Sequence, residues 1–148
     1  MRTSALVSIG LLVAGVCVAC FAQSPPARSC PQPRFTGKAP EPYYSQQNPL
    51  PADRDLGAAE KLFKGEVPGK FGCAPCHGPT GAGDGKLSSQ FDPRPRNFAC
   101  AETIRDVPDG QLFWIIRFGS PGASMPPHKN LTDEQIWELV SYVRRLTR

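Results

Sequence analysis

The chain has 148 residues, of which 17 are lysine or arginine and 13 are aspartate or glutamate, for a formal net charge of +4. This small excess of positive charge does not indicate a nucleic-acid partner. Once the N-terminal and proline-rich segments are set aside, about 95 residues remain, which suffices for one small domain.

Residues 1–22 have the pattern of a secretory signal peptide. An uncharged, mostly apolar run ends at Ala22, and small residues at Cys20 and Ala22 permit cleavage before Gln23. Two alternatives stay open: a lipoprotein signal with Cys20 as the lipidated residue, and an uncleaved membrane anchor. We expect an exported protein in the periplasm, free or anchored to the membrane and facing the periplasm.

Residues 23–51 contain eight of the seventeen prolines in 29 positions and little apolar content. This composition predicts a semi-extended linker or arm and not a second domain. The folded domain then covers residues 52–148. Its first helix is predicted from about Asp53 to Lys64, with Gly65 in position to end it.

The pentapeptide Cys73-Ala74-Pro75-Cys76-His77 is the most informative feature of the chain. C-x-x-C-H is the attachment sequence of c-type haem, in which two thiols add to the vinyl groups and the histidine ligates the iron. A zinc site or a thioredoxin-like pair would need a second ligand pair or a βαβ pattern, and the sequence has neither. One covalent haem is expected, with Cys73 and Cys76 as attachment points and His77 as an axial ligand, because no second C-x-x-C-H occurs.

The next segment, residues 78–98, is rich in glycine, proline and serine, and this composition predicts a loop beside the haem. A helix follows over residues 109–118, where Leu112, Ile115 and Ile116 form one apolar face. Gly119 is placed to end this helix. It is expected to form one wall around the haem.

Met125 is the candidate for the second axial ligand. It is the single methionine beyond the N-terminal segment, and Pro126 and Pro127 stiffen its loop. A thioether prefers reduced iron, so a His77/Met125 pair raises the reduction potential and suits an electron carrier. His128 is a weaker alternative ligand and is expected at the surface.

The last predicted helix begins after Thr132 and runs towards the C-terminus. Thr132 and Gln135 have the spacing of a capping box, and acidic residues occupy the first turn. Apolar residues recur at helical spacing along one face. They are Ile136, Leu139, Val140, Val143 and Leu146.

Taken together, the residues from about Asp53 to Arg148 resemble a bacterial, exported class I monohaem cytochrome c. The resemblance covers about two thirds of the chain and rests on C-A-P-C-H, the glycine-rich stretch after it, the S-M-P-P segment and the start of the last helix. It implies a small all-α fold with three main helices around one covalent haem c. It also implies that a proline-containing loop supplies the carbonyl that orients His77, with Pro93 and Pro95 as the candidates.

Cysteine counting leaves one further pair. Six cysteines divide into two in the N-terminal segment, two on the haem, and Cys30 with Cys100. In an oxidising compartment these two can form a disulfide that ties the arm to the domain, or they can stay free thiols. Spacing does not decide between the two.

Three functions remain as hypotheses. The first is an electron carrier, not an enzyme, that cycles Fe(III)/Fe(II) between a donor such as a dehydrogenase or the bc1 complex and an acceptor oxidase or reductase. The second is a tethered cytochrome subunit of a dehydrogenase or oxidoreductase complex. The third is a ligand-binding haem sensor or enzyme in which Met125 is displaceable.

Overall fold

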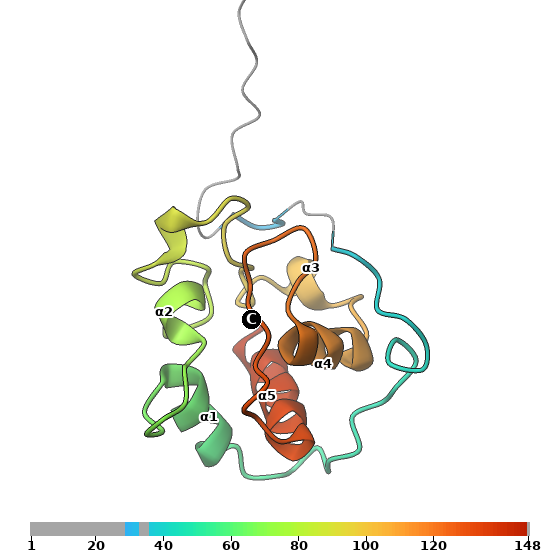
Figure 1. Ribbon diagram of the computed structural model, residues 1–148. Coiled ribbons are helices and arrows are strands. Elements are labelled where there is room, and N and C mark those ends of the chain that lie inside the picture. Colours follow the sequence, from blue (N-terminus) through green and yellow to red (C-terminus); the bar gives the residue numbers. More distant parts are fainter. Residues whose placement is uncertain (1–28, 33–35, 148) are drawn as a thin grey trace, which may run out of the picture.

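The regular structure of the chain is helical. The computed structural model describes residues 29–32 and 36–147 (Figure 1). Its elements are α1 (Gly57–Lys64), α2 (Ala74–His77), the 3-10 helix η1 (Ser88–Gln90), α3 (Ala101–Ile104), α4 (Asp109–Phe118) and α5 (Asp133–Leu146). No strand occurs among these residues, so the expected all-α fold is confirmed. The signal and anchor alternatives, with Cys20, lie outside the described residues.

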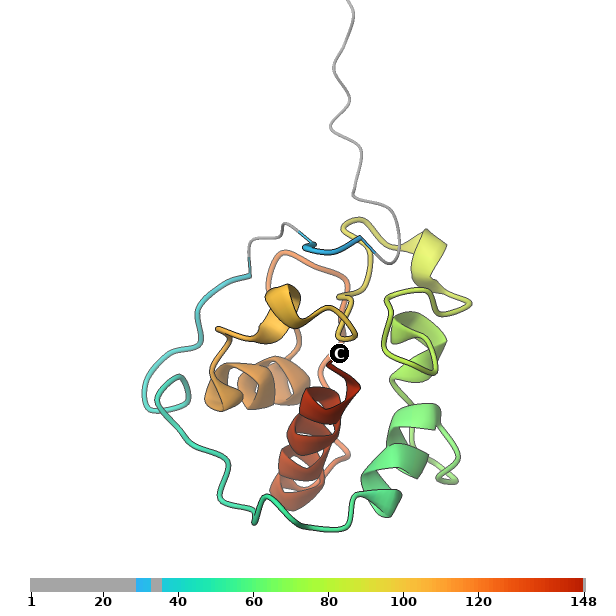
Figure 2. The ribbon, with the colours of Figure 1, turned by 180° about the vertical axis from the view of Figure 1, so that it is seen from behind.

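The long C-terminal helix α5 is the centre of the packing. It lies between α1 and α4 in both views (Figures 1 and 2). Most of its apolar face is buried, with Ile136, Leu139 and Val140 at most 1% exposed, and Leu146 near its end is half-buried. The Thr132 hydroxyl accepts a hydrogen bond from the Gln135 backbone N–H, and the Gln135 side chain accepts one from the Thr132 N–H. The expected capping box is therefore present.

The other two main helices meet α5 through aromatic side chains. Phe63 of α1 lies against Tyr142, with ring centroids 5.2 Å apart, and Phe113 of α4 stacks on Trp137 at 4.4 Å. Rings of this size bury a large apolar area, so these two contacts form part of the core that joins the three helices. Among the described helices, none is long and apolar enough to cross a membrane.

Helices α1 and α4 end directly before the glycines that were expected to end them. Gly65 adopts a left-handed conformation with φ 82° after α1, and Gly119 has φ 86° after α4. The start of α1 was predicted too early: the helix begins at Gly57, whose N–H is bound by the Asp55 carboxylate. The short helices α2 and α3, of four residues each, were not predicted.

The proline-rich arm, described at residues 29–32 and 36–51, packs against the helices. It follows the outer side of α4 and then passes below α5 to reach α1 (Figures 1 and 2). Buried Gln111 of α4 binds both the N–H of Ala39 and the carbonyl of Gly37, at 2.6 and 2.9 Å. Asn48 donates to the carbonyl of Trp137 at 3.1 Å. The arm is irregular, as expected for its composition, but it covers the domain over most of its described length.

Candidate haem site

The attachment motif folds into a single helical turn. The backbone N–H of His77 donates to the carbonyl of Cys73 at 2.9 Å, and the N–H of Cys73 donates to the carbonyl of Phe63 in α1 at 2.8 Å. A Cβ atom at Gly85 would collide with the carbonyl oxygens of Ala74 and Pro75, so only glycine lets the following loop lie this close. The turn therefore begins against α1, and it carries both thiols and the imidazole.

A cavity of about 550 Å³ lies beside this turn. Cys73, Cys76, His77 and Met125 all line it, so the structure brings the four predicted haem residues to one site. Its apolar walls come from the three main helices, as expected for α4. They include Phe63, Leu112, Ile116, Leu139, Val140 and Val143.

The two thiols are free of any disulfide. Burial raises the pKa of the Cys73 thiol to about 12, and burial also raises the pKa of Cys76. Both side chains are therefore neutral at physiological pH in the folded chain, in an environment that accepts apolar thioethers better than thiolates.

The His77 side chain is held on two sides. Its Nδ1 lies 3.0 Å from the carbonyl oxygen of Arg96, and its ring stacks on Phe98 with centroids 4.4 Å apart. Because a carbonyl oxygen only accepts, Nδ1 is the protonated nitrogen of neutral His77. Nε2 is then the nitrogen available to iron, which is the arrangement that a histidine ligand needs.

The carbonyl that faces His77 belongs to Arg96 and not to Pro93 or Pro95. The carbonyl of Pro95 instead accepts a hydrogen bond from the buried Gln32 side chain at 3.1 Å. Both prolines do line the cavity. The sequence therefore identified the right loop but not the carbonyl that faces His77.

The Met125 loop is fixed by backbone hydrogen bonds. The Ser120 N–H donates to the Met125 carbonyl at 3.2 Å, and the His128 N–H donates to the Ile116 carbonyl of α4 at 3.0 Å. Met125 is half-buried at the cavity. His128 is 9% exposed and also lines the cavity, so the expectation of a surface histidine was wrong; burial lowers its pKa.

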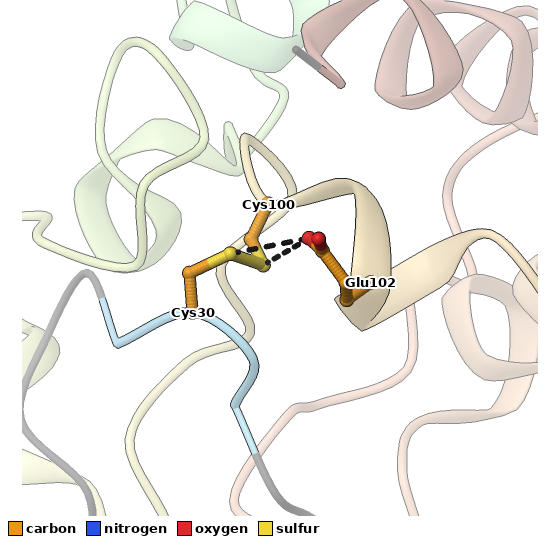
Figure 3. A group of neighbouring side chains, drawn as sticks. All are labelled: Cys30, Cys100 and Glu102. Atoms are coloured by element: carbon orange, nitrogen blue, oxygen red, sulfur yellow. Dashed lines mark hydrogen bonds between the residues drawn. A yellow bond between two sulfur atoms is a disulfide. The ribbon is translucent and has the colours of Figure 1, made fainter.

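Cys30 and Cys100 are joined by a disulfide, with Cα atoms 5.6 Å apart (Figure 3). The bridge fixes the arm beside the start of α3. The Glu102 carboxylate lies 3.3 Å from each sulfur. Disulfide sulfurs carry no hydrogen, so these are contacts and not hydrogen bonds. The same three side chains have metal-ligating atoms close together, but with both sulfurs in the bridge they are not a metal site.

The residues fit a covalent haem. The cavity combines two neutral thiols, a thioether, apolar walls and an imidazole whose Nδ1 is hydrogen-bonded to a backbone carbonyl. A c-type haem requires these donors and this apolar surface. Four residues with roles at the site were not found from the sequence: Gln32, Arg96 (whose backbone carbonyl accepts from His77), Phe98 and Glu102. Their roles depend on contacts between distant segments, for which the sequence carries no local signal.

The fold and site define a small all-α protein with a covalent haem centre. Residues 57–147 match the family model for Cytochrome c, which is more than half of the chain, so the protein belongs to the cytochrome c family. Membership carries with it covalently bound haem c and haem-based electron transfer.

One solved structure is informative beyond the family. It is a chain of the Kuenenia stuttgartiensis reducing HAO-like protein complex, with a TM-score of 0.51 and 28% sequence identity. The match covers 66% of this chain and 44% of that chain, so this protein corresponds to less than half of its length. No curated protein is significantly similar to this chain.

Proposed function

We propose that this protein is an exported class I monohaem electron carrier with His77 and Met125 as its axial iron ligands. It cycles one haem between Fe(III) and Fe(II) and passes single electrons between partner proteins, without bond chemistry on a substrate. The donor is a dehydrogenase or the bc1 complex, and the acceptor is an oxidase or reductase.

The observation that carries the proposal is the donor set of the cavity. His77 and Met125 line the same cavity, and Nδ1 of His77 is held by the Arg96 carbonyl at 3.0 Å. A haem iron with a protein ligand on each face would have no vacancy for a substrate. The bound haem supplies the one-electron couple, and the protein side chains hold its iron, exclude water and set its potential.

The first experiment is an optical spectrum of the matured protein in both oxidation states, with carbon monoxide added to the reduced form. A sulfur-to-iron charge-transfer band in the red and no response to carbon monoxide are expected. An absent band with rapid carbon monoxide binding would overturn the carrier and favour the sensor or enzyme with a displaceable Met125.

The matched variants are Met125→Ala, Met125→His and Ser124→Ala. Met125→Ala should lower the reduction potential and let carbon monoxide bind, because the soft thioether that favours Fe(II) is lost. Met125→His should keep six-coordinate iron at a lower potential. Ser124→Ala lies in the same loop and should change neither property. An unchanged potential in Met125→Ala would refute the ligand assignment.

A second candidate function is a tethered cytochrome subunit of an oxidoreductase complex. The similar solved chain comes from a reducing HAO-like protein complex, which favours this alternative. Affinity purification of the matured protein from its native host under mild conditions separates the two. A stoichiometric large partner that reduces the haem would support a subunit, and recovery of the cytochrome alone at full yield would support a free carrier.

Export to the periplasm is part of the same proposal. It rests on the apolar segment before Gln23, with cleavage at that residue and a lipid anchor at Cys20 as the alternative. The intact mass of the mature protein tests it. A mass equal to that of residues 23–148 plus one haem indicates a free periplasmic protein. A mass that includes a lipid-modified Cys20 indicates an anchor. Retention of residues 1–22 would contradict cleavage.

A further inference from the structure

The arm lies before the part of the chain that matches the cytochrome c family, yet its residues reach the haem cavity. Gln32, Thr36, Lys38 and Tyr44 line the cavity, whereas the family match begins at residue 57. The arm therefore adds a part to the haem site that the family region does not contain. Near the cavity, three arm residues form hydrogen bonds to one short segment, residues 95–97: Ser29, Gln32 and Thr36.

Gln32 binds this segment at two points. Its Nε2 donates to the carbonyl of Pro95 at 3.1 Å, and its Oε1 accepts from the backbone N–H of Asn97 at 3.0 Å. One partner only accepts and the other only donates, so the orientation of the amide is fixed. Gln32 is 5% exposed, and both polar atoms of its side-chain amide form hydrogen bonds. The residue between the two contacts is Arg96.

Two further arm contacts secure the same segment. The Asn97 side chain donates to the carbonyl of Ser29 at 3.1 Å, and the Arg96 guanidinium donates to the Thr36 hydroxyl at 2.6 Å. The Cys30–Cys100 disulfide then fixes this end of the arm covalently (Figure 3).

The opposite side of the segment is closed by the loop after the attachment motif. A Cβ atom at Gly83 would lie 2.7 Å from the Pro95 carbonyl, and the Phe98 N–H donates to the Gly81 carbonyl at 2.7 Å. Residues 95–98 are thus held between this loop and the arm. The Arg96 carbonyl has little freedom to turn away from His77.

We propose that Gln32 is a positioning residue of the haem site: it holds the Arg96 carbonyl against Nδ1 of His77 and so helps to set the reduction potential. The inference rests on the proposed role of His77 as an iron ligand. A hydrogen bond from Nδ1 to a carbonyl makes the imidazole a stronger electron donor and favours Fe(III). Loosening the carbonyl weakens this bond and raises the potential.

The experiment compares Gln32→Ala with Asn48→Ala in the haem-loaded protein. Asn48 also binds the arm to the domain, through the Trp137 carbonyl and the Ser141 hydroxyl, but it does not line the haem cavity. Both changes remove a polar anchor of the arm. They differ in whether that anchor holds the carbonyl at His77.

Three quantities are measured: the midpoint potential, the solvent exchange rate of the His77 Nδ1 proton by NMR in the reduced form, and the melting temperature. Gln32→Ala should raise the midpoint potential. It should also increase the exchange rate of the Nδ1 proton by about tenfold, because exchange requires opening of the carbonyl contact. Asn48→Ala should lower the melting temperature and leave the other two values unchanged.

A Gln32→Ala protein that is less stable but keeps the wild-type potential and exchange rate would overturn the inference. If Gln32→Ala does not load haem, Gln32→Leu takes its place. That change keeps a side chain of similar volume and removes both hydrogen bonds to Pro95 and Asn97; the same two shifts are expected, and their absence again overturns the inference. Failure of the proposed carrier is separate, because it is read from the carbon monoxide response and sulfur band of the wild type.

Discussion

The two sides of the haem cavity are built by different means. On one side, α1, α4 and α5 present apolar side chains such as Phe63, Leu112 and Val140, each part of one large core. On the other side, residues 77–98 and the arm form an irregular wall of backbone carbonyls and single hydrogen bonds to polar side chains.

Apart from the Cys30–Cys100 disulfide, this difference separates the residues that stabilise the fold from those that set the ligand geometry. On the helical side many contacts contribute to stability, so a single substitution should lower the free energy of unfolding and leave the iron ligands in place. On the irregular side one hydrogen bond orients His77, so a small change should alter the electronic properties of the iron. Single variants on each side test whether the separation holds.

The largest expected effect on unfolding comes from the covalent link of the irregular side. Replacing Cys30 and Cys100 together by serine should lower the free energy of unfolding by about 4 kcal/mol, since a crosslink over 70 residues restricts the unfolded chain strongly. Urea unfolding of the haem-loaded proteins measures this. A loss below about 1 kcal/mol would mean that the unfolded chain is already restrained by other links.

On the helical side, Ile136→Ala should cost about 3 kcal/mol, because Ile136 is fully buried and the change leaves a cavity. Ile136 does not line the haem cavity, so the reduction potential should stay at its wild-type value. Ile136→Val is the matched control, with an expected cost of about 1 kcal/mol. A shifted potential in Ile136→Ala would show that the two sides are coupled.

At the start of α5, Thr132→Ala should cost about 1 kcal/mol, since the hydroxyl that caps Gln135 is lost. Thr132→Ser keeps the hydroxyl and should restore most of this stability. Thermal unfolding followed by far-ultraviolet circular dichroism gives both values. Equal stability of the alanine and serine variants would mean that the capping box contributes nothing.

The smallest effect concerns His128, which is buried and lines the cavity. Burial lowers its pKa in the folded protein, so the unfolded chain binds the proton more tightly. The contribution of neutral His128 to stability is complete above the unfolded pKa of about 6.5 and is lost as the pH falls through the lower folded value. His128→Gln should therefore flatten the decrease of stability between about pH 7 and 5. An unchanged slope would contradict this.

The helical side was largely predictable from the sequence. The capping box at Thr132, the bounds of α4 and the buried face of α5 follow from local spacing, because neighbours within one turn determine them. The start of α1 was predicted at about Asp53, four residues too early, whereas the Asp55 side chain binds the Gly57 N–H from outside the helix.

The irregular side was predictable only in its covalent chemistry. The C-x-x-C-H motif identifies Cys73, Cys76 and His77 by spacing alone. The Arg96 carbonyl and the Gln32 contacts depend on backbone atoms, which every residue carries and which therefore leave no trace in the sequence. The burial of His128 likewise depends on how its loop returns to Ile116 of α4.

The order of the cysteines has a consequence for biosynthesis. The Cys30–Cys100 bridge encloses Cys73 and Cys76 in the sequence, and of the six single disulfides that these four cysteines can form, one leaves both attachment thiols free. Once the chain has folded, burial keeps Cys73 protonated, and a protonated thiol is a poor nucleophile. We therefore expect the thioethers to form on an open chain, before packing of the surrounding residues buries Cys73.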